Sequence, residues 1–374
     1  MDNTNIVQEN QEYVDSKCPN CGSKLQFLPG SNNVKCISCD STFEIESLGQ
    51  GKLEDEEVDY SSTLEKIRAN SLEMKKQRTI HCESCGGLIL LNDKTVSTTC
   101  PFCNSNRVVL EDKQQEIIKI AGVVPFVIDE ESIKDTFRKW IRKRFLAPSK
   151  FKKGKVKPSF SAFYIPYYTF DSDTNSNYTA YRGDYYYVTR TVRTSNGYRT
   201  VRERRTRWTF VRGQVFLQFD DILVNGTNNI LNKYISKISN YDFSLMERYQ
   251  EKFLLGYYAE RPSVTLEDGF NNAKNIMMQN IRQKCIRDIG GDTYRDLRVS
   301  TNFNDVTFKQ IMVPIYNGSY EYNKKKYQFV CNGQNGKFAG KHPISPIKVI
   351  LFVFAIIIAA ALTLLLTYYF LQNS

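Results

Sequence analysis

Residues 18–22 read Cys-Pro-Asn-Cys-Gly, and residues 36–39 read Cys-Ile-Ser-Cys. The same arrangement returns 64 residues later, as Cys-Glu-Ser-Cys-Gly at 82–86 and Cys-Pro-Phe-Cys at 100–103. Each copy therefore has the spacing C-x2-C-x14-C-x2-C. Two cysteines separated by two residues can turn both sulfur atoms toward one point, and the glycine after each first pair permits the tight turn that this requires. The repeat indicates two small units, each built around four thiolates.

Four thiolates at this spacing are typical of a structural zinc site, which is tetrahedral and closed to substrate. Disulfide bonds are the alternative, but they need an oxidising compartment, and no segment reads as a secretory signal peptide. A catalytic zinc is disfavoured because neither site has an open position. We predict two structural zinc ions, held by Cys18, Cys21, Cys36 and Cys39 and by Cys82, Cys85, Cys100 and Cys103.

Charge is distributed unevenly along the 374 residues, whose formal net charge is +11. Residues 1–60 carry four basic and twelve acidic side chains, whereas residues 137–157 carry ten basic side chains and no acidic one. Residues 178–212 hold nine arginines against Asp184 and Glu203. The positive field therefore lies outside the cysteine repeats, which lack the basic surface that nucleic-acid binding needs.

The order of these stretches predicts a multidomain chain. It comprises two small zinc-ribbon (β) units, an α+β cytosolic domain with a mainly antiparallel sheet, and one C-terminal transmembrane helix. The predicted ranges are 1–15 (disordered), 16–46 (ribbon 1), 47–79 (acidic linker and helix), 80–112 (ribbon 2), 113–345 (α+β domain with an arginine-rich hairpin) and 347–371 (transmembrane helix).

Apolar spacing predicts helices over residues 60–79 and 130–145, and Thr265 begins a capping box for a helix that ends at Ile289. The basic side of the 130–145 helix is either a solvated face or a surface for anionic lipid or an acidic partner. Residues 150–157 are predicted to form a basic loop. Strands are predicted over residues 25–28, 42–45, 117–127, 160–170, 178–192, 198–211, 294–301, 307–315, 320–322 and 327–331.

The arginine-rich stretch reads as a β-hairpin, with Ser-Asn-Gly at 195–197 as its turn. Arginines on the two arms are expected to face one another, which would be destabilising unless something neutralises them. Either solvent suffices because the hairpin projects, or a negatively charged partner or surface binds there. The candidate binding residues are Arg190, Arg193, Arg202, Arg204, Arg205 and Arg207.

Residues 349–371 form a run of 23 side chains without a charge. At about 1.5 Å per residue, a helix of this length crosses a hydrocarbon core of about 30 Å. Lysines precede the run and no charged residue follows it, so the positive-inside rule predicts a cytoplasmic N-terminal part. We therefore predict a single-pass cell-membrane protein, whose reduced thiolates suit the same side.

Further motifs resemble a bacterial family of membrane proteins described as containing TFIIB-type zinc ribbons. Beside the cysteine pairs, the matching stretches are Phe145-Leu146-Ala147-Pro148, Tyr164-Ile165-Pro166-Tyr167, Leu255-Gly256-Tyr257-Tyr258-Ala259-Glu260, Asn332-Gly333-Gln334-Asn335-Gly336 and the Gly340…Pro343-Ile344-Ser345 run. Members are often labelled as related to replication factor Y or to helicases, but this chain has no G-x-x-x-x-G-K-[ST] phosphate loop. The resemblance implies a role in a membrane complex with a phage-shock protein A-like and a flotillin-like partner.

Two functions compete, and an enzyme is disfavoured because no HExxH, GxSxG, kinase or dinucleotide motif occurs. The first is a non-enzymatic, membrane-anchored scaffold or adaptor that recruits cytosolic proteins, contacts membrane lipid and takes no small-molecule substrate. The alternative is a membrane-tethered nucleic-acid binder using residues 190–212 and 150–157, with Tyr187, Tyr198 and Trp208 stacking on bases.

Overall fold

The computed structural model describes residues 17–72, 74–90, 99–103, 105–116, 118–153, 156, 158–194, 197–229 and 231–372. The predicted disordered N-terminus and the hairpin turn at 195–196 lie outside these residues. The helices are α1 (Tyr60–Arg68), α2 (Glu130–Arg142), α3 (Ser149–Lys153), α4 (Asn232–Ile235), α5 (Leu266–Ile289) and α6 (Pro346–Gln372), with short 3-10 turns η1 (Glu54–Glu56), η2 (Phe243–Leu245) and η3 (Glu251–Leu254). The strands are β1 (Leu25–Leu28), β2 (Asn33–Cys36), β3 (Thr42–Glu44), β4 (Val58–Asp59), β5 (Met74–Cys82), β6 (Leu88–Leu90), β7 (Val108–Glu116), β8 (Ile120–Val123), β9 (Ser159–Thr194), β10 (Gly197–Asn225), β11 (Glu247–Arg248), β12 (Tyr258–Glu260), β13 (Thr293–Tyr322), β14 (Lys325–Asn332) and β15 (Phe338–Gly340).

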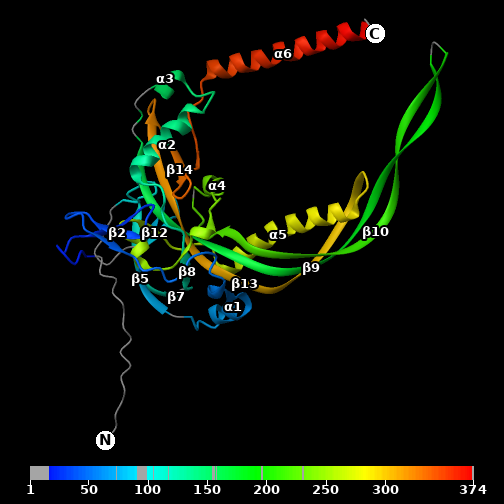
Figure 1. Ribbon diagram of the computed structural model, residues 1–374. Coiled ribbons are helices and arrows are strands. Elements are labelled where there is room, and N and C mark those ends of the chain that lie inside the picture. The colour runs from blue at the N-terminus through cyan, green and yellow to red at the C-terminus, as the bar shows by residue number, and fades with distance from the viewer. Residues whose placement is uncertain are drawn as a thin grey trace.

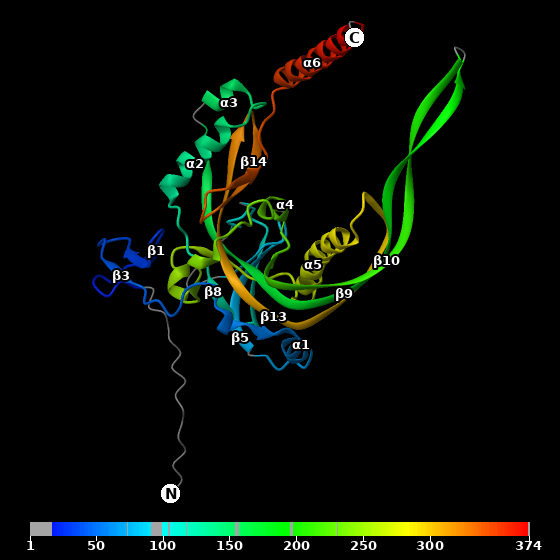
Figure 2. The same ribbon diagram turned by 45° about the vertical axis from the view of Figure 1, so that its right-hand side comes forward.

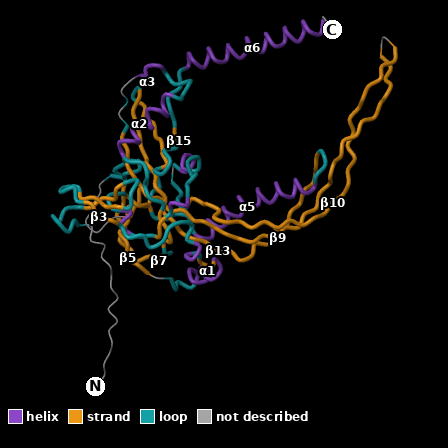
Figure 3. The backbone as a smooth tube through the Cα atoms, viewed as in Figure 1, coloured by secondary structure: helices purple, strands orange, loops and turns teal. Residues whose placement is uncertain are grey.

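Two sheets organise these strands (Figures 1 and 3). The first cysteine repeat has its own three-stranded sheet, in the order β1-β2-β3. All the other strands join one sheet with the central order β11-β8-β13-β9-β12-β6-β5-β7, to which β4, β10, β14 and β15 add. Pairing is antiparallel except for β8 with β13 and β12 with β9. The predicted α+β class with a mainly antiparallel sheet is confirmed.

Two very long strands, β9 and β13, form the centre of the main sheet. They span 36 and 30 residues, so different partners pair with different stretches of each strand. Near the body they are flanked by short strands, and farther out β9 pairs with β10 alone on one side and β13 on the other. Figures 1 and 2 show these three strands leaving the body as a curved arm.

Helix α5 lies along this arm and buries its apolar side against it. The side chain of Thr265 accepts from Asp268 N, as the capping box predicts, and Gly290 ends the helix with φ 64°. Phe270, Met277, Ile281 and Cys285 are buried against the arm strands. Burial of aromatic and aliphatic side chains is the main force that holds helix and strands together.

Sequence reasoning expected two strands within β9 and three within β13 (294–301, 307–315 and 320–322), where the structure has one continuous strand in each case. The polar stretch at 171–177 was the predicted break in β9. Its alternate residues are small and hydroxylated, and they are buried with hydrogen-bond partners. Thr174 Oγ1 donates to Leu217 O at 2.7 Å, and Ser176 bonds Thr301 at 2.8 Å. Because these short polar groups are satisfied across the strands, the sheet continues through them.

The helix predicted over 60–79 is wrong beyond Arg68. Asn70 adopts a left-handed conformation with φ 49°, and the chain then enters β5. β5 pairs antiparallel with β7, which follows the second cysteine repeat. Local apolar spacing could not reveal this distant partner.

The basic loop predicted at 150–157 begins instead as the short helix α3. Phe151 is buried, with its ring 5.0 Å from that of Tyr322 and 5.4 Å from that of Tyr320. This contact fixes the segment on the end of the β13–β14 hairpin. In α2 the prediction is confirmed, since Ile133, Phe137, Trp140 and Ile141 are buried.

Helix α6 is long and apolar enough to cross a membrane. Its candidate span is Pro346–Phe370; an 18-residue window within it has a mean hydropathy of 3.2, and none of that window is buried against the body. An uncovered apolar helix is not part of a soluble core.

Candidate functional site

The four cysteines of each repeat converge. In the first repeat, Cys18 Sγ lies 3.6 Å from Cys39 Sγ, and Cys21 Sγ lies 3.4 Å from Cys36 Sγ. In the second repeat the corresponding sulfur pairs are 3.6 and 3.7 Å apart, and within each group all sulfur atoms lie within 4.8 Å of one another. A disulfide would hold two sulfurs at about 2.0 Å. Four sulfurs bound to one zinc ion at about 2.3 Å lie about 3.8 Å apart. Both clusters are therefore positioned to hold a metal ion.

Turns at the paired cysteines aim the sulfurs. Gly22 and Gly86 have φ of 70° and 76°, which glycine adopts without strain. Gly22 N donates to Cys18 O at 2.8 Å, and Gly86 N donates to Cys82 O at the same distance. The predicted glycine turns are confirmed in both copies.

The first cluster faces outward. Cys21 and Cys39 are exposed, and Ile37 at the tip of the second pair is 61% exposed. Hydrogen bonds from the hydroxyl and amide of Ser41 lower the pKa of Cys39 to about 6, which favours the thiolate that a metal ion requires. The β1–β3 sheet joins the body through several contacts: the Phe27 ring lies 5.4 Å from that of Phe253, and Gly30 N donates to Phe126 O at 2.8 Å.

The second cluster is built into the body. Cys82, Cys85 and Cys100 are buried. Phe102 stacks on Phe163 of β9 with ring centroids 3.9 Å apart, and Phe102 O accepts from Asn317 Nδ2 at 2.6 Å. Strands β5–β7 of this repeat belong to the main sheet, so the predicted 80–112 unit shares its hydrogen bonding with the larger domain.

A second feature is the end of the arm, where β13 stops pairing and β9 continues with β10 alone. The last pair between β13 and β9 joins Thr293 to Gly183. Beyond it, residues 184–194 and 197–207 form a two-stranded hairpin that we call the distal ribbon. It contains seven arginines and two carboxylates. The candidate residues Arg190, Arg193, Arg202, Arg204, Arg205 and Arg207 all lie on it and are exposed.

The register corrects one expectation about these arginines. None of the six candidates faces another arginine across the ribbon: Arg190 pairs with Val201, Arg193 with Tyr198, Arg202 with Thr189, Arg204 with Tyr187, Arg205 with Tyr186 and Arg207 with Asp184. Like charges are therefore not directly opposed, and the destabilisation predicted from facing arginines does not arise.

Tyrosines separate the arginines and are partly covered by them. The guanidinium carbons of Arg202 and Arg204 lie 4.2 and 4.3 Å from the ring centroids of Tyr187 and Tyr185. Arg295 covers Trp208 at 4.4 Å. These cation–π contacts order the ribbon surface and occupy one face of rings that base stacking would use.

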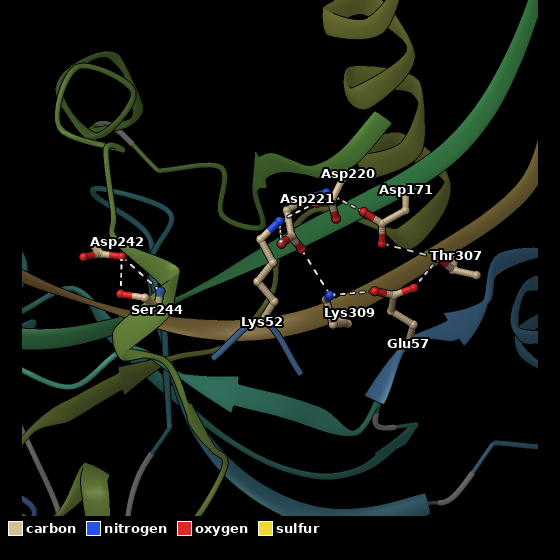
Figure 4. Close-up of polar contacts among 9 residues, drawn as sticks. All are labelled: Lys52, Glu57, Asp171, Asp220, Asp221, Asp242, Ser244, Thr307 and Lys309. Atoms are coloured by element: carbon tan, nitrogen blue, oxygen red, sulfur yellow. Dashed lines mark hydrogen bonds and ion pairs between the residues drawn. The ribbon is translucent and has the colours of Figure 1, made fainter. Parts of the chain in front are cut away.

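Sequence reasoning missed a buried ionic cluster at the root of the arm (Figure 4). Lys309 of β13, with a side chain 0% exposed, lies 2.9 Å from Glu57 Oε1 and 3.1 Å from Asp221 Oδ1. Thr307 Oγ1 donates to Glu57 and to Asp171, and Lys52 pairs with Asp220 and Asp221. Burial raises the pKa of Asp171 to about 6. The carboxylates of Asp171, Asp220 and Asp221 lie close enough to bind one cation. The positive charge beside them comes from the ammonium groups of Lys52 and Lys309.

The cluster coincides with two irregularities in strand register. β10 shifts between Phe219 and Ile222, and β13 shifts between Asn304 and Thr307, on either side of Asp171. Such bulges bend strands. The local signals were the Asp220-Asp221 pair inside a strand pattern and Lys309, which lies inside the predicted 307–315 strand. The pairing itself joins residues 252 positions apart and has no local signature.

Comparison with known proteins identifies a relative of similar length. The chain is 27% identical to YdjG of Bacillus subtilis (strain 168), which is described as uncharacterized, over 339 residues that cover 90% of this chain and 92% of that protein. No protein-family model matches the chain. No solved structure matches it. The resemblance to zinc-ribbon membrane proteins therefore stays a prediction.

Proposed function

We propose that the protein is a non-enzymatic scaffold, anchored in the cell membrane by α6, which recruits cytoplasmic proteins through ribbon 1 and the distal ribbon. The main observation behind the proposal is that the protein has two kinds of exposed surface, one apolar and one polar or charged. Helix α6 is apolar and uncovered, while Cys21 and Cys39 of the first cluster and the arginines of the distal ribbon are exposed. A protein that joins a membrane to soluble partners needs these two kinds of surface.

Zinc is the metal that the clusters fit best. Both offer four soft thiolates, with sulfur separations near the tetrahedral value and no open position for a substrate. Their role is to hold the fold of each ribbon, because a closed four-thiolate site stabilises structure without activating water. Reduced thiolates and the lysines before α6 both favour a cytoplasmic body. The implied partners are a phage-shock protein A-like and a flotillin-like protein.

The nucleic-acid alternative is weakened by ring contacts on the distal ribbon and at the residue next to it, Trp208. One face of Tyr187 is covered by Arg202 and one face of Trp208 by Arg295, so two of the three rings proposed for base stacking are partly occupied.

Affinity purification of the full chain from detergent-solubilised membranes tests the proposal. We expect specific cytoplasmic proteins to be recovered with the wild type and lost with Cys18→Ser or with a variant of the distal ribbon. A matched variant with Gln at Lys237, Arg282, Lys284 and Arg287, which are exposed outside the distal ribbon, should retain them. Recovery of nucleic acid in place of proteins, abolished by the distal-ribbon variant, would replace the scaffold with the alternative.

A further inference from the structure

The start of α6 is fixed to the body at the corner between α2 and α3 (Figures 1 and 2). Ser345 N donates to Leu146 O at 2.9 Å, and Lys348 Nζ donates to Ala147 O at 2.7 Å. The ring of Phe145 lies 5.9 Å from that of Phe352, which is two turns into α6. These contacts determine which part of the body stands beside the point where α6 would enter a bilayer.

That part of the body is strongly basic. Helix α2 is acidic in its first turn and basic toward its end, and its basic end lies next to α6. Lys134 pairs with Glu130 at 3.4 Å, and Arg138 pairs with Asp135 at 2.6 Å. Within the part of the chain that the structure describes, no ion pair joins the remaining cations of α2 and α3 to a carboxylate; these are Lys139, Arg142, Lys143, Lys150, Lys152 and Lys153.

The turn between β13 and β14 extends the same surface. Phe151 of α3 packs on Tyr322 at the end of β13, which brings the next residues beside α3. Lys324, Lys325 and Lys326 follow at once and are exposed, with Glu321 as the nearby carboxylate in sequence. We call residues 139–153, which run from the end of α2 through α3, together with Lys324, Lys325 and Lys326, the basic collar.

Phe145 is an exposed aromatic residue of the collar that lies level with the start of the uncharged run of α6. It is 68% exposed, yet its partner Phe352 lies three residues inside the uncharged run that begins at Val349. With a rise of about 1.5 Å per residue, Phe352 is about 4.5 Å along the run. An exposed aromatic ring at this level matches the boundary between headgroups and acyl chains.

We propose that the basic collar binds the headgroups of anionic phospholipids around α6, with Phe145 inserted at the acyl boundary. The inference rests on the proposed membrane span of α6 and adds a specific lipid class to it. Lipid is favoured over an acidic protein because the collar and the span are held together, so the headgroups are already in reach. Basic residues close to a bilayer are attracted to anionic lipid, and the attraction weakens with salt.

The test is lysine footprinting of the full chain in vesicles of phosphatidylcholine, with or without phosphatidylglycerol. A membrane-impermeant acylating reagent should label Lys139, Lys143, Lys150 and Lys153 several-fold less when phosphatidylglycerol is present, and high salt should restore labelling. Lys284 on α5 is the internal control and should react equally in both vesicles. Changing Lys139, Arg142 and Lys143 to Gln should remove the protection of Lys150 and Lys153, whereas Gln at Arg282, Lys284 and Arg287 should not.

Equal labelling of the collar in both vesicles, in a chain that resists high-salt extraction, would overturn the collar and leave the anchor intact. A chain extracted by high salt from both vesicles would overturn the span and the collar together. Protection seen only in native membranes, and never in purified vesicles, would overturn the lipid assignment in favour of an acidic protein.

Discussion

At the scale of single residues, the cysteines and Lys309 show what local spacing can and cannot reveal. Two residues between paired cysteines place both sulfurs on one turn, so the ligand sets could be predicted from the sequence, and the convergence of each set is confirmed. The ionic cluster around Lys309 depends on chain segments far apart, and its residues carried only weak signals. Contacts of this kind are decided by the fold and not by neighbours in sequence.

Loss of the two predicted zinc sites should have different effects on the melting temperature of the protein. Cys18→Ser should reduce bound zinc from about two ions to about one, with little change in the melting temperature of the body, because ribbon 1 has its own sheet. Cys100→Ser should remove the other ion and lower the melting temperature markedly, because that cluster is buried in the main sheet. Metal analysis with thermal unfolding of the reduced protein measures both. Equal thermal effects of the two variants would contradict the distinction.

Lys309 should be the most sensitive charged residue outside the metal sites. Lys309→Met leaves Glu57 and Asp221 without their buried cation, and breaking such a pair costs about 3–5 kcal/mol of unfolding free energy. Lys284→Met, on the exposed side of α5, should change it by about 0.5 kcal/mol or less. Denaturant unfolding in detergent compares the two. A loss at Lys309 no larger than that at Lys284 would show that the cluster does not stabilise the arm.

Asp171 should give the cluster a pH dependence. Its pKa is about 6 in the folded protein and 3.8 in its ordinary state, with burial as the main cause. The folded protein therefore holds this proton more tightly, so the contribution of Asp171 to stability is greatest at low pH and declines as pH rises from about 4 to about 6. Asp171→Asn cannot titrate and should lose less stability than the wild type as the pH rises from about 4 to about 6. Parallel curves for the two proteins would refute this role.

At the scale of elements, predictions succeeded where a signal and its structural consequence lie in the same segment. Helix α5 begins after Thr265 and ends at Gly290, as its capping pattern predicts, and the apolar side of α2 is buried as predicted. The predictions failed where pairing with a distant strand determines the local structure. Residues 74–82 are a strand because β7 pairs with them, and β9 continues through polar residues because β10 and β13 satisfy those side chains. Long-range pairing also supplied the register that separates the arginines.

The distal ribbon should bind through charge without being needed for folding. Changing Arg202, Arg204, Arg205 and Arg207 to Gln removes four exposed charges, so we expect a shift of about 0.5 kcal/mol or less per position in unfolding free energy. Partner recruitment should fall, and the residual binding should depend less on salt. The control carries Gln at Lys237, Arg282, Lys284 and Arg287. Binding assays against membrane extracts at two salt concentrations compare the variants, and equal recruitment by both would remove the ribbon from the proposed function.

At the scale of the whole molecule, the arm and α6 extend from the body toward the same side (Figure 1). The body holds one cysteine cluster inside its main sheet and carries the other on its outside. If α6 lies in a bilayer, the collar faces that bilayer while ribbon 1 remains accessible to cytoplasmic proteins. The proposed scaffold function therefore depends on attachment of α6 to the membrane.

Fractionation of cells that express either the full chain or a chain ending at Ser345 tests membrane attachment most directly. The full chain should remain in the membrane pellet after a high-salt wash, and the shortened chain should be in the soluble fraction with both zinc ions still bound. Release of the shortened chain only at high salt would indicate that the collar alone holds it peripherally. A shortened chain that stays in the pellet after high salt, or a full chain that washes off, would contradict anchoring by α6.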